Sequence, residues 1–313
     1  MLLSIVVPVY NEEDVVEVFF QRLIGALESL QCNKEIIFIN DGSTDSTFTI
    51  LERFKQHNPE VAIIDLSRNF GKEIAMTAGL DHANGDATVV IDADLQDPPE
   101  LIRELFSYWQ EGYDVVYARR IDRKGETFLK KITASIFYRF IMSASRVPIP
   151  RDTGDFRLMS RRAVDSLNRL RERHRFMKGL FAWIGFPQKS VLYHRDPRYA
   201  GNSKWNYWKL WNFAIEGITS FTDAPLRLAM YLGLFTSLIA FIYGAWVIFK
   251  TLVFGESVIG YPSLMVVILF LGGIQLVGIG IMGEYLGRTF SETKNRPLYL
   301  IKNYEPSIYN NQE

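Results

Sequence analysis

Short apolar runs alternate with longer segments of mixed polarity through the first third of the chain. Five runs have the length of buried strands: Leu2–Val9, Glu35–Asn40, Val61–Leu66, Ala87–Ile91 and Asp114–Tyr117. The segments between them have helical length, as in Glu12–Leu30, Thr44–His57 and Gly71–Ala83. This alternation predicts an α/β fold with a parallel sheet covered by helices on both faces. Ligands of such sheets bind at the carboxyl ends of the strands, so we expect the chemistry at that edge.

The C-terminal third contains two long segments without a charged residue. Leu228–Phe249 and Tyr261–Met282 are each 22 residues long. At a rise of 1.5 Å per residue, each forms a helix of about 33 Å, enough to cross a hydrocarbon core of about 30 Å. The glycines of the second segment suit close packing of the two helices. A pair of core helices in a soluble domain is the alternative. By the positive-inside rule, the flanking basic residues place both ends in the cytoplasm: Arg227, Arg288, Lys294 and Arg296.

Two further segments have the pattern of helices that lie in the membrane interface. One precedes the first span and gathers aromatic rings and lysines: Lys204, Trp205, Tyr207, Trp208, Lys209, Trp211 and Phe213. The other is Lys124–Ile141, in which apolar residues recur near helical spacing beside basic ones. Aromatic rings and long basic side chains favour the headgroup region. For both segments, an amphipathic helix packed on the sheet is the alternative.

Charge is divided unevenly along the chain. The 313 residues carry 35 basic and 35 acidic side chains, so the formal charge is zero and a nucleic-acid partner is not expected. Residues 1–118 have 7 basic and 21 acidic side chains, a net of −14, whereas residues 119–178 have 17 and 6, a net of +11. This order suggests one region that holds a cation and another that meets an anion. The single cysteine, Cys32, excludes a disulfide framework.

Asp92-Ala93-Asp94 directly follows the fourth expected strand, so its carboxylates lie at a carboxyl end. Gln96 and Asp97 add oxygen atoms just after it. Mg²⁺ or Mn²⁺ is commonly held by one or two carboxylates together with substrate phosphates. Asp-x-Asp alone is a weak motif, but its position before the helix start Pro98-Pro99-Glu100 strengthens it. A helix cap in a solvated turn is the alternative.

Three other strand ends bring polar residues to the same edge. Asp41 follows the second strand, where Gly42 permits a tight turn, and its carboxylate can accept hydrogen bonds from a base or a ribose. The first strand ends in Pro8-Val9-Tyr10-Asn11-Glu12, and the third ends near Arg68 and Lys72, cations that can meet a diphosphate. The sequence has no Gly-x-Gly-x-x-Gly after the first strand, which argues against a dinucleotide dehydrogenase. It likewise has no Gly-x-x-x-x-Gly-Lys-[Ser/Thr] phosphate loop.

Taken together, these motifs resemble one family. Pro8-Val9-Tyr10-Asn11-Glu12, Asp41-Gly42-Ser43-Thr44-Asp45 and Asp92-Ala93-Asp94-Leu95-Gln96-Asp97-Pro98-Pro99 are similar to the signature set of the family 2 inverting glycosyltransferases. The resemblance is strongest to the polyprenyl-phosphate glycosyltransferases, meaning the bactoprenol glucosyltransferases and the dolichol-phosphate mannose synthase group. Thr153-Gly154-Asp155-Phe156-Arg157 and the two C-terminal spans also resemble the bactoprenol subgroup, so the similarity covers nearly the whole chain.

The resemblance implies a GT-A fold, a Rossmann-like mixed sheet, and a division of the chain. Residues 1–200 would form the catalytic domain, 201–226 the interfacial loop and amphipathic helix, 227–284 the two transmembrane helices and 285–313 a cytoplasmic tail. It also implies a nucleotide-sugar site made of Pro8, Tyr10, Glu12, Asp41, Arg68, Lys72 and Asp92. Asp94 and Gln96 would ligate the metal. Arg198, Ser203 and Lys204 would be the working residues of a loop that folds over the donor.

Asp155 and the basic segment are the candidates for the acceptor side. A hydroxyl acceptor needs a general base, whereas a polyprenyl phosphate is already anionic at neutral pH. We therefore expect Asp155, which with Asp94 is our candidate catalytic residue, to orient a substrate more than to take a proton. A structural pair with Arg157 is the alternative. The residues expected to meet the lipid phosphate are Arg119, Arg123, Lys124 and Arg157.

The expected reaction is metal-dependent, inverting transfer of a hexose, first of all glucose, from a UDP-sugar to polyprenyl (undecaprenyl) phosphate. It would take place at a lipid bilayer, on the cytoplasmic face of the inner membrane, for cell-envelope or O-antigen glycosylation, with both termini cytoplasmic. A UDP-GlcNAc or GDP-mannose donor and a homo-oligomer stay open. A processive polysaccharide synthase would carry a Gln-x-x-Arg-Trp segment, which the sequence lacks. A non-catalytic membrane scaffold is the alternative from another class, and the intact aspartates argue against it.

Overall fold

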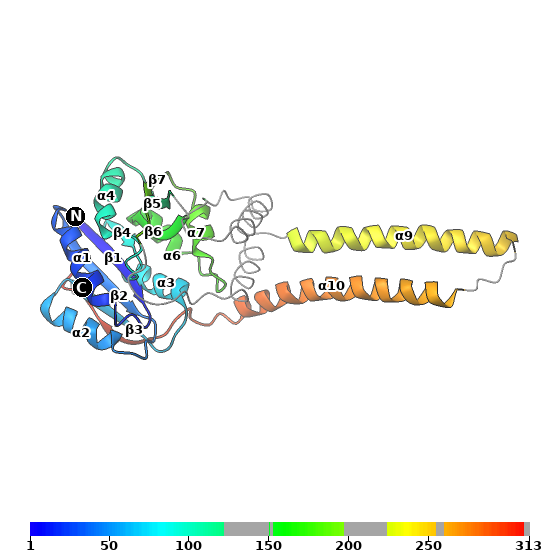
Figure 1. Ribbon diagram of the computed structural model, residues 1–313, viewed down its shortest axis with the longest axis horizontal. Helices are drawn as coiled ribbons and strands as arrows, with labels where there is room; N and C mark the ends of the chain where they lie inside the picture. Colours follow the sequence, from blue (N-terminus) through cyan, green and yellow to red (C-terminus); the bar gives the residue numbers. More distant parts are fainter. Residues whose placement is uncertain (122–149, 151–152, 197–223, 255–259, 310–313) are drawn as a thin grey trace.

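A computed structural model describes residues 1–121, 150, 153–196, 224–254 and 260–309. In it, a sheet flanked by helices adjoins two long helices that extend away on one side (Figure 1). Some predicted residues lie outside the described ranges: Arg123, Lys124, Arg198, Ser203 and Lys204, together with both expected interfacial segments.

The sheet has eight strands in the order β7-β5-β6-β4-β1-β2-β3-β8. The strands of its centre run parallel: β1 (Leu2–Val9), β2 (Asn33–Asn40), β3 (Val61–Leu66) and β4 (Ala87–Val90). β5 (Val115–Arg120) and β7 (Gln188–Tyr193) keep that direction. Two strands are antiparallel to their neighbours, β6 (Thr153–Ser160) between β4 and β5, and β8 (Ile301–Glu305) beside β3. The expected mixed α/β sheet is therefore confirmed.

Helices cover both faces of this sheet. One face is packed by α1 (Val16–Glu28), α2 (Thr47–His57) and α4 (Ile102–Gln110), which follows the short 3-10 turn Pro99–Leu101. The other is packed by α3 (Lys72–His82), α6 (Arg161–Asn168) and α7 (Met177–Trp183).

The central strands are apolar on both sides because both faces are covered. In β2, Ile36 and Phe38 pack toward α1 and α2, whereas Ile37 and Ile39 pack toward α3. All four side chains are fully buried. Burying a side chain of this size contributes about 1.5–3 kcal/mol each, so these continuous apolar runs hold the two layers together. For this reason the strands were recognised in the sequence as continuous apolar runs, and not by an alternation of apolar and polar residues.

The helices begin later than the sequence predicts, because the residues before them form hydrogen-bonded turns. The Asn11 side chain accepts from Thr44 N at 2.8 Å, and the backbone of Asn11 has a positive φ of 52°. Asp45 Oδ1 accepts from the backbone N of Thr47, the first residue of α2, at 3.0 Å. These turns tie the ends of β1 and β2 to each other at the carboxyl edge.

The hairpin consists of α9 (Ala224–Phe254) and α10 (Tyr261–Thr293). Leu228–Phe254 and Val266–Thr293 are long enough to cross a membrane, and the most apolar 18 residues of each have mean hydropathies of 2.0 and 2.3. None of either apolar stretch is buried against the described residues, so the alternative of core helices in a soluble domain is wrong. The two helices lie side by side in Figure 1.

One expectation about the hairpin is also wrong. We expected the glycines of α10 to give close packing against α9. A Cβ atom placed on Gly272, Gly273, Gly278, Gly280 or Gly283 would meet nothing within 4 Å. The groove between the helices is lined instead by larger residues: Thr236, Ile239, Ala240, Tyr243, Val267, Phe270 and Leu271.

A glycine on α3 permits the closest approach between a helix and the sheet, and its replacement should destabilise the domain. A Cβ on Gly79 would collide with the Val6 side chain and lie 2.6 Å from Ile39 Cδ1. We expect Gly79→Ala to lower the free energy of unfolding by about 1–3 kcal/mol through overpacking. Gly25→Ala, on the exposed face of α1 with nothing within 4 Å, is the control and should stabilise by about 0.5–1 kcal/mol. Thermal melts of both variants test this, and equal melting temperatures would contradict it.

Candidate functional site

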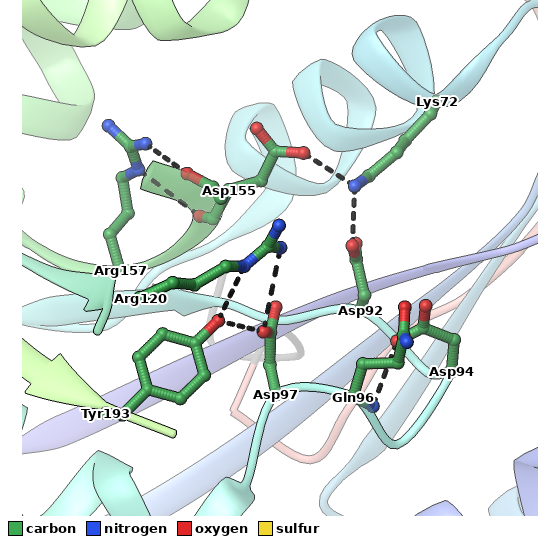
Figure 2. A network of polar contacts seen from close by, with 10 residues as sticks. Lys72, Asp92, Asp94, Gln96, Asp97, Arg120, Asp155, Arg157 and Tyr193 are labelled. Carbon is green, nitrogen blue, oxygen red and sulfur yellow. Dashed lines mark hydrogen bonds and ion pairs between the residues drawn. The ribbon is translucent and has the colours of Figure 1, made fainter. Parts of the chain in front are cut away.

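The residues that follow β1, β2, β3 and β4 meet at the carboxyl edge of the sheet, as predicted. Lys72 is the first residue of α3, Asp92 follows β4, and Asp155 lies near the start of the antiparallel strand β6. Because β6 runs against β4, its amino end reaches the edge where the parallel strands finish. Lys72 and Asp155, which are 83 positions apart in the chain, thus face each other (Figure 2).

Lys72 lies between two carboxylates. Its Nζ is 2.6 Å from Asp92 Oδ2 and 2.6 Å from Asp155 Oδ2. Burial alone would lower the pKa of Lys72, but the charges of Asp155 and Asp92 outweigh it and raise that pKa. Burial likewise favours protonation of Asp155, yet the ammonium of Lys72 and the charge of Lys178 hold the pKa of Asp155 well below its usual range. Both members of this pair therefore stay charged at neutral pH.

The two carboxylate oxygens of Asp155 differ in their hydrogen bonding. Oδ2 accepts from Lys72, whereas Oδ1 is buried and has no hydrogen-bond partner in the described part of the chain. The residue is 8% exposed. A buried carboxylate oxygen without a partner is costly, so it is a position where a bound molecule can donate a hydrogen bond.

Arg157 supports the backbone around Asp155. It is 4% exposed, its guanidinium lies 3.5 Å from the centre of the Phe181 ring, and it donates to the carbonyls of Gly154 at 2.9 Å and Asp155 at 3.2 Å. Burial lowers the pKa of Arg157 to about 10. The sequence placed Arg157 at the lipid phosphate, whereas the contacts of this side chain are with β6 and α7.

Asp94 and Gln96 lie next to each other on the loop after β4 (Figure 2). Gln96 N donates to Asp94 Oδ1 at 3.1 Å, and Leu95 between them has a positive φ of 58°, which turns both polar side chains to the same side. Leu95 itself is buried in the core. A carboxylate and an amide oxygen held together in this way match the oxygen ligands that Mg²⁺ and Mn²⁺ take.

Asp97, which the sequence offered as a further oxygen ligand, instead anchors this loop. It is 1% exposed and accepts a hydrogen bond from the Tyr193 hydroxyl, which in turn accepts from Arg120 Nε at 3.2 Å. Arg120 Nη2 lies 4.0 Å from Asp97. Sequence reasoning missed Tyr193, and it counted Arg120 only among the basic residues that could meet a lipid phosphate, not as a partner of Asp97.

Asp41 holds the loop that carries two of the predicted donor-binding residues. Its two carboxylate oxygens accept from Phe70 N at 2.7 Å and Gly71 N at 2.9 Å. Burial raises the pKa of Asp41, and these two backbone donors oppose that shift. A Cβ on Gly42, whose φ is +67°, would lie 2.5 Å from the carbonyl carbon of Arg68, so only glycine fits this contact.

The remaining predicted residues lie around the same edge. Pro8 is on β1, paired with Ile39, and Tyr10 is 37% exposed just beyond it. Glu12 N donates to Thr47 Oγ1 at 2.9 Å. Arg68 is exposed, with its guanidinium 4.0 Å from the centre of the Phe70 ring. Arg119 is exposed on β5, in register with Thr153 of β6.

Glu73, beside Lys72, is a half-buried acid that sequence reasoning did not single out. Its Oε2 is buried without a partner in the described residues. Burial is the main cause that raises its pKa to about 8, and the negative charge of Asp155 adds to it, while Lys72 and Lys178 oppose it. Glu73 is thus protonated over much of the range in which Asp155 is ionised.

This pKa predicts a pH-dependent contribution to stability. Between its ordinary value of 4.5 and about 8, Glu73 holds a proton in the folded state but not in the unfolded state, so its contribution to folding falls as pH rises through that window. We expect Glu73→Gln to melt at a higher temperature than the wild type at pH 8, with the difference shrinking toward pH 5. Glu104→Gln, at an exposed position on α4, is the control. A difference that stays constant with pH would refute this assignment.

Comparison with known proteins agrees with this geometry. Residues 4–167 match the model of glycosyl transferase family 2, and residues 224–289 match the GtrB C-terminal hairpin. An uncharacterized glycosyltransferase of Synechocystis, sll0501, is 55% identical over 299 residues, which cover 96% of this chain and 94% of that protein. The bactoprenol glucosyl transferase of Shigella phage SfV is 52% identical over 303 residues, covering 97% of this chain and 99% of that protein.

Among solved structures, mannosyl-3-phosphoglycerate synthase from Rubrobacter xylanophilus aligns with a TM-score of 0.48 and 18% identity, over 69% of this chain and 71% of that one. The family model covers more than half of the chain, and the sequence relatives cover nearly all of it. The mixed sheet, the acidic edge and the C-terminal hairpin therefore belong to a glycosyltransferase of family 2.

Proposed function

We propose that this chain transfers glucose from UDP-glucose to a polyprenyl phosphate at a membrane surface, with inversion at the anomeric carbon. The observation that carries the proposal is the charged cluster at the sheet edge, where Lys72 joins Asp92 to Asp155 beside Asp94 and Gln96. The choice of sugar and acceptor is supported by the relative named bactoprenol glucosyl transferase, which matches over nearly the full length of both chains.

On the donor side, Asp94 and Gln96 would hold Mg²⁺ or Mn²⁺. When bound, such a metal supplies positive charge that stabilises the departing diphosphate. The described residues contain no group of three His, Cys, Asp or Glu side chains around one point, so the proposal needs donor phosphate oxygens to complete the coordination. Arg68 and Lys72 lie on the loop and helix start that follow β3, where their charges favour the same diphosphate.

At the reacting carbon, Asp155 would orient the donor sugar. Its open Oδ1 accepts a hydrogen bond from a sugar hydroxyl, while Lys72 keeps the carboxylate ionised and Arg157 holds the backbone of the strand that carries it. A phosphate oxygen of the acceptor attacks the anomeric carbon as the bond from that carbon to the diphosphate oxygen breaks, and UDP leaves. The attacking oxygen is already anionic, so no proton has to be removed.

On the acceptor side, the exposed Arg119 on β5 would meet the lipid phosphate, and its register with Thr153, two residues before Asp155, supports this assignment. Arg157 is assigned to positioning instead, since its guanidinium is buried against Phe181. The hairpin helices supply the membrane attachment that a lipid acceptor requires.

Purified full-length protein in lipid vesicles tests the reaction. With UDP-glucose, Mn²⁺ or Mg²⁺ and a polyprenyl phosphate, we expect UDP release and one glucose per lipid. Adding EDTA should abolish turnover and restoring the metal should recover it, because the diphosphate then regains its counter-charge. UDP-GlcNAc and GDP-mannose are tested in parallel, and faster turnover with either would reassign the donor. Lipids that carry several sugars would indicate a processive synthase, and no release of UDP or GDP with any donor would leave only a scaffold.

Removing the charge of Asp155 should affect turnover more than donor binding. We expect Asp155→Asn to lower kcat by about 100-fold or more, the usual scale for the loss of one preorganised polar group, with KM for UDP-glucose changed only a few-fold. The control is Asp165→Asn, which removes an exposed carboxylate whose ion pair among the described residues is with Arg161 on the same helix. Turnover of Asp155→Asn within a few-fold of wild type would rule out the assigned role.

A further inference from the structure

Both connections between the sheet and the hairpin are made at the edge that holds the site. Thirty residues (194–223) join the carboxyl end of β7 to α9, and seven residues (294–300) join α10 to the amino end of β8. β7 and β8 are the two outermost strands of the sheet. Because β8 is antiparallel to β3, its first residue, Ile301, lies beside Leu66 at the carboxyl end of β3. The chain therefore leaves for the hairpin, and returns from it, at the catalytic edge.

The end of α10 is attached directly to the catalytic domain. The loop between α6 and α7 bonds to it, since Arg173 N donates to Glu292 Oε1 at 2.8 Å and the Arg173 guanidinium donates to the carbonyl of Arg296. Further along, Tyr299 donates to Asp81 Oδ2 on α3 at 2.8 Å. Ser67 N donates to the carbonyl of Leu300 at 2.9 Å, on the loop that leads to Arg68 and Lys72.

The segment that follows is fixed over β3, β2 and α2. Lys302 lies 3.1 Å from the buried Asp65, and Lys55 Nζ donates to the carbonyl of Pro306 at 2.6 Å. Ser307 is fully buried and donates to Glu35 Oε2 at 3.2 Å. Ile308 N donates to the carbonyl of Pro59 at 3.0 Å. Residues 292–308, named here the C-terminal arm, are thus part of the catalytic domain and not a loose tail.

We propose that the C-terminal arm fixes the height of the catalytic edge above the membrane, so that the site meets the phosphate of a lipid acceptor. α10 continues as one helix from the apolar segment ending at Met282 to the docked Glu292, ten residues later. At 1.5 Å per residue this is a rigid distance of about 15 Å. The seven-residue connection is short and is hydrogen-bonded to the catalytic domain at Arg296, Tyr299 and Leu300, so we assign the setting of this distance to the arm. This inference rests on the proposed lipid acceptor.

Lengthening α10 tests the inference. Seven helix-forming residues inserted between Arg288 and Thr289 add two turns and about 10 Å, and rotate the helix by only about 20°, so Glu292 still faces its partner. The matched control carries the same seven residues after Ile308, beyond the last contact of the arm. Both variants keep every residue of the site and of the arm.

The first readout is the height of the catalytic domain above the membrane, which can be measured without catalysis. A fluorophore on Cys32, the single cysteine, lies just before β2 at the amino end of the strands, away from the site. We expect energy transfer from it to acceptor-labelled headgroups of lipid vesicles to fall in the lengthened variant and to be unchanged in the control. Equal transfer in the two variants overturns the inference, whatever the enzyme's substrate is.

The second readout compares two acceptors, a long polyprenyl phosphate embedded in vesicles and a short, water-soluble prenyl phosphate. The lengthened variant should lose at least tenfold in turnover of the embedded acceptor and stay within twofold of wild type with the soluble one. An equal loss with both acceptors, or no loss with either, overturns the inference. Wild-type turnover of the soluble acceptor tests the proposed function separately.

Point variants give a milder form of the same test without an insertion. Glu292→Ala removes the acceptor of Arg173 N, whereas Glu284→Ala removes an equal charge whose ion pair in the described part of the chain is with Arg288 on the same helix. We expect Glu292→Ala to lower turnover of the embedded acceptor several-fold relative to the soluble one, and Glu284→Ala to leave this ratio unchanged. The same ratio in both variants would show that the docking of α10 has no part in reaching the lipid.

Discussion

The site depends on one ammonium group held between two carboxylates. Asp92 and Asp155 come from neighbouring strands, and without Lys72 their like charges would favour protonation of one of them. Lys72 keeps 42% of its side chain exposed, so solvent screens these ion pairs and they add little to stability. Their importance lies in the charge state that they impose. They hold Asp155 ionised in a buried position while Glu73, one residue from Lys72, stays protonated.

The loops around this cluster are held by contacts that would not themselves touch a substrate. Asp41 uses both carboxylate oxygens to fix the loop before Lys72, and Asp97, on the loop that carries Asp94 and Gln96, is fixed by Tyr193 and Arg120. Both acids are nearly fully buried, and their hydrogen bonds hold these loops in place. Preorganised charge is effective in catalysis because little reorganisation is needed when the reaction occurs. The supporting carboxylates are therefore as much a part of the site as those of Asp92, Asp94 and Asp155.

The sequence was sufficient to predict the parallel centre of the sheet, because its strands are continuous apolar runs followed by polar residues. It placed Asp41, Asp92 and Asp94 at one edge for the same reason. The sequence was not sufficient to predict how strands pair when they lie far apart in the chain. The proximity of Lys72 to Asp155 depends on β6 running antiparallel, which no local pattern specifies. Strand β8 has three exposed and two half-buried residues, so it lacks the apolar run by which strands were identified, and Asp97 resembles a ligand until its burial is known.

The position of the site relative to a bilayer follows from the energetics of its proposed substrate. Transferring each CH₂ group of a lipid chain from membrane to water costs about 0.8 kcal/mol. A polyprenyl chain of many isoprene units would therefore cost more to extract than the roughly 20 kcal/mol that the strongest non-covalent binding provides. An enzyme for such an acceptor has to bring its catalytic edge to the phosphate where it already lies. In this protein both edge strands connect to the hairpin at the catalytic edge, so the topology of the sheet itself turns the site toward the helices. The binding energy of the acceptor is then available for alignment of the phosphate with the anomeric carbon.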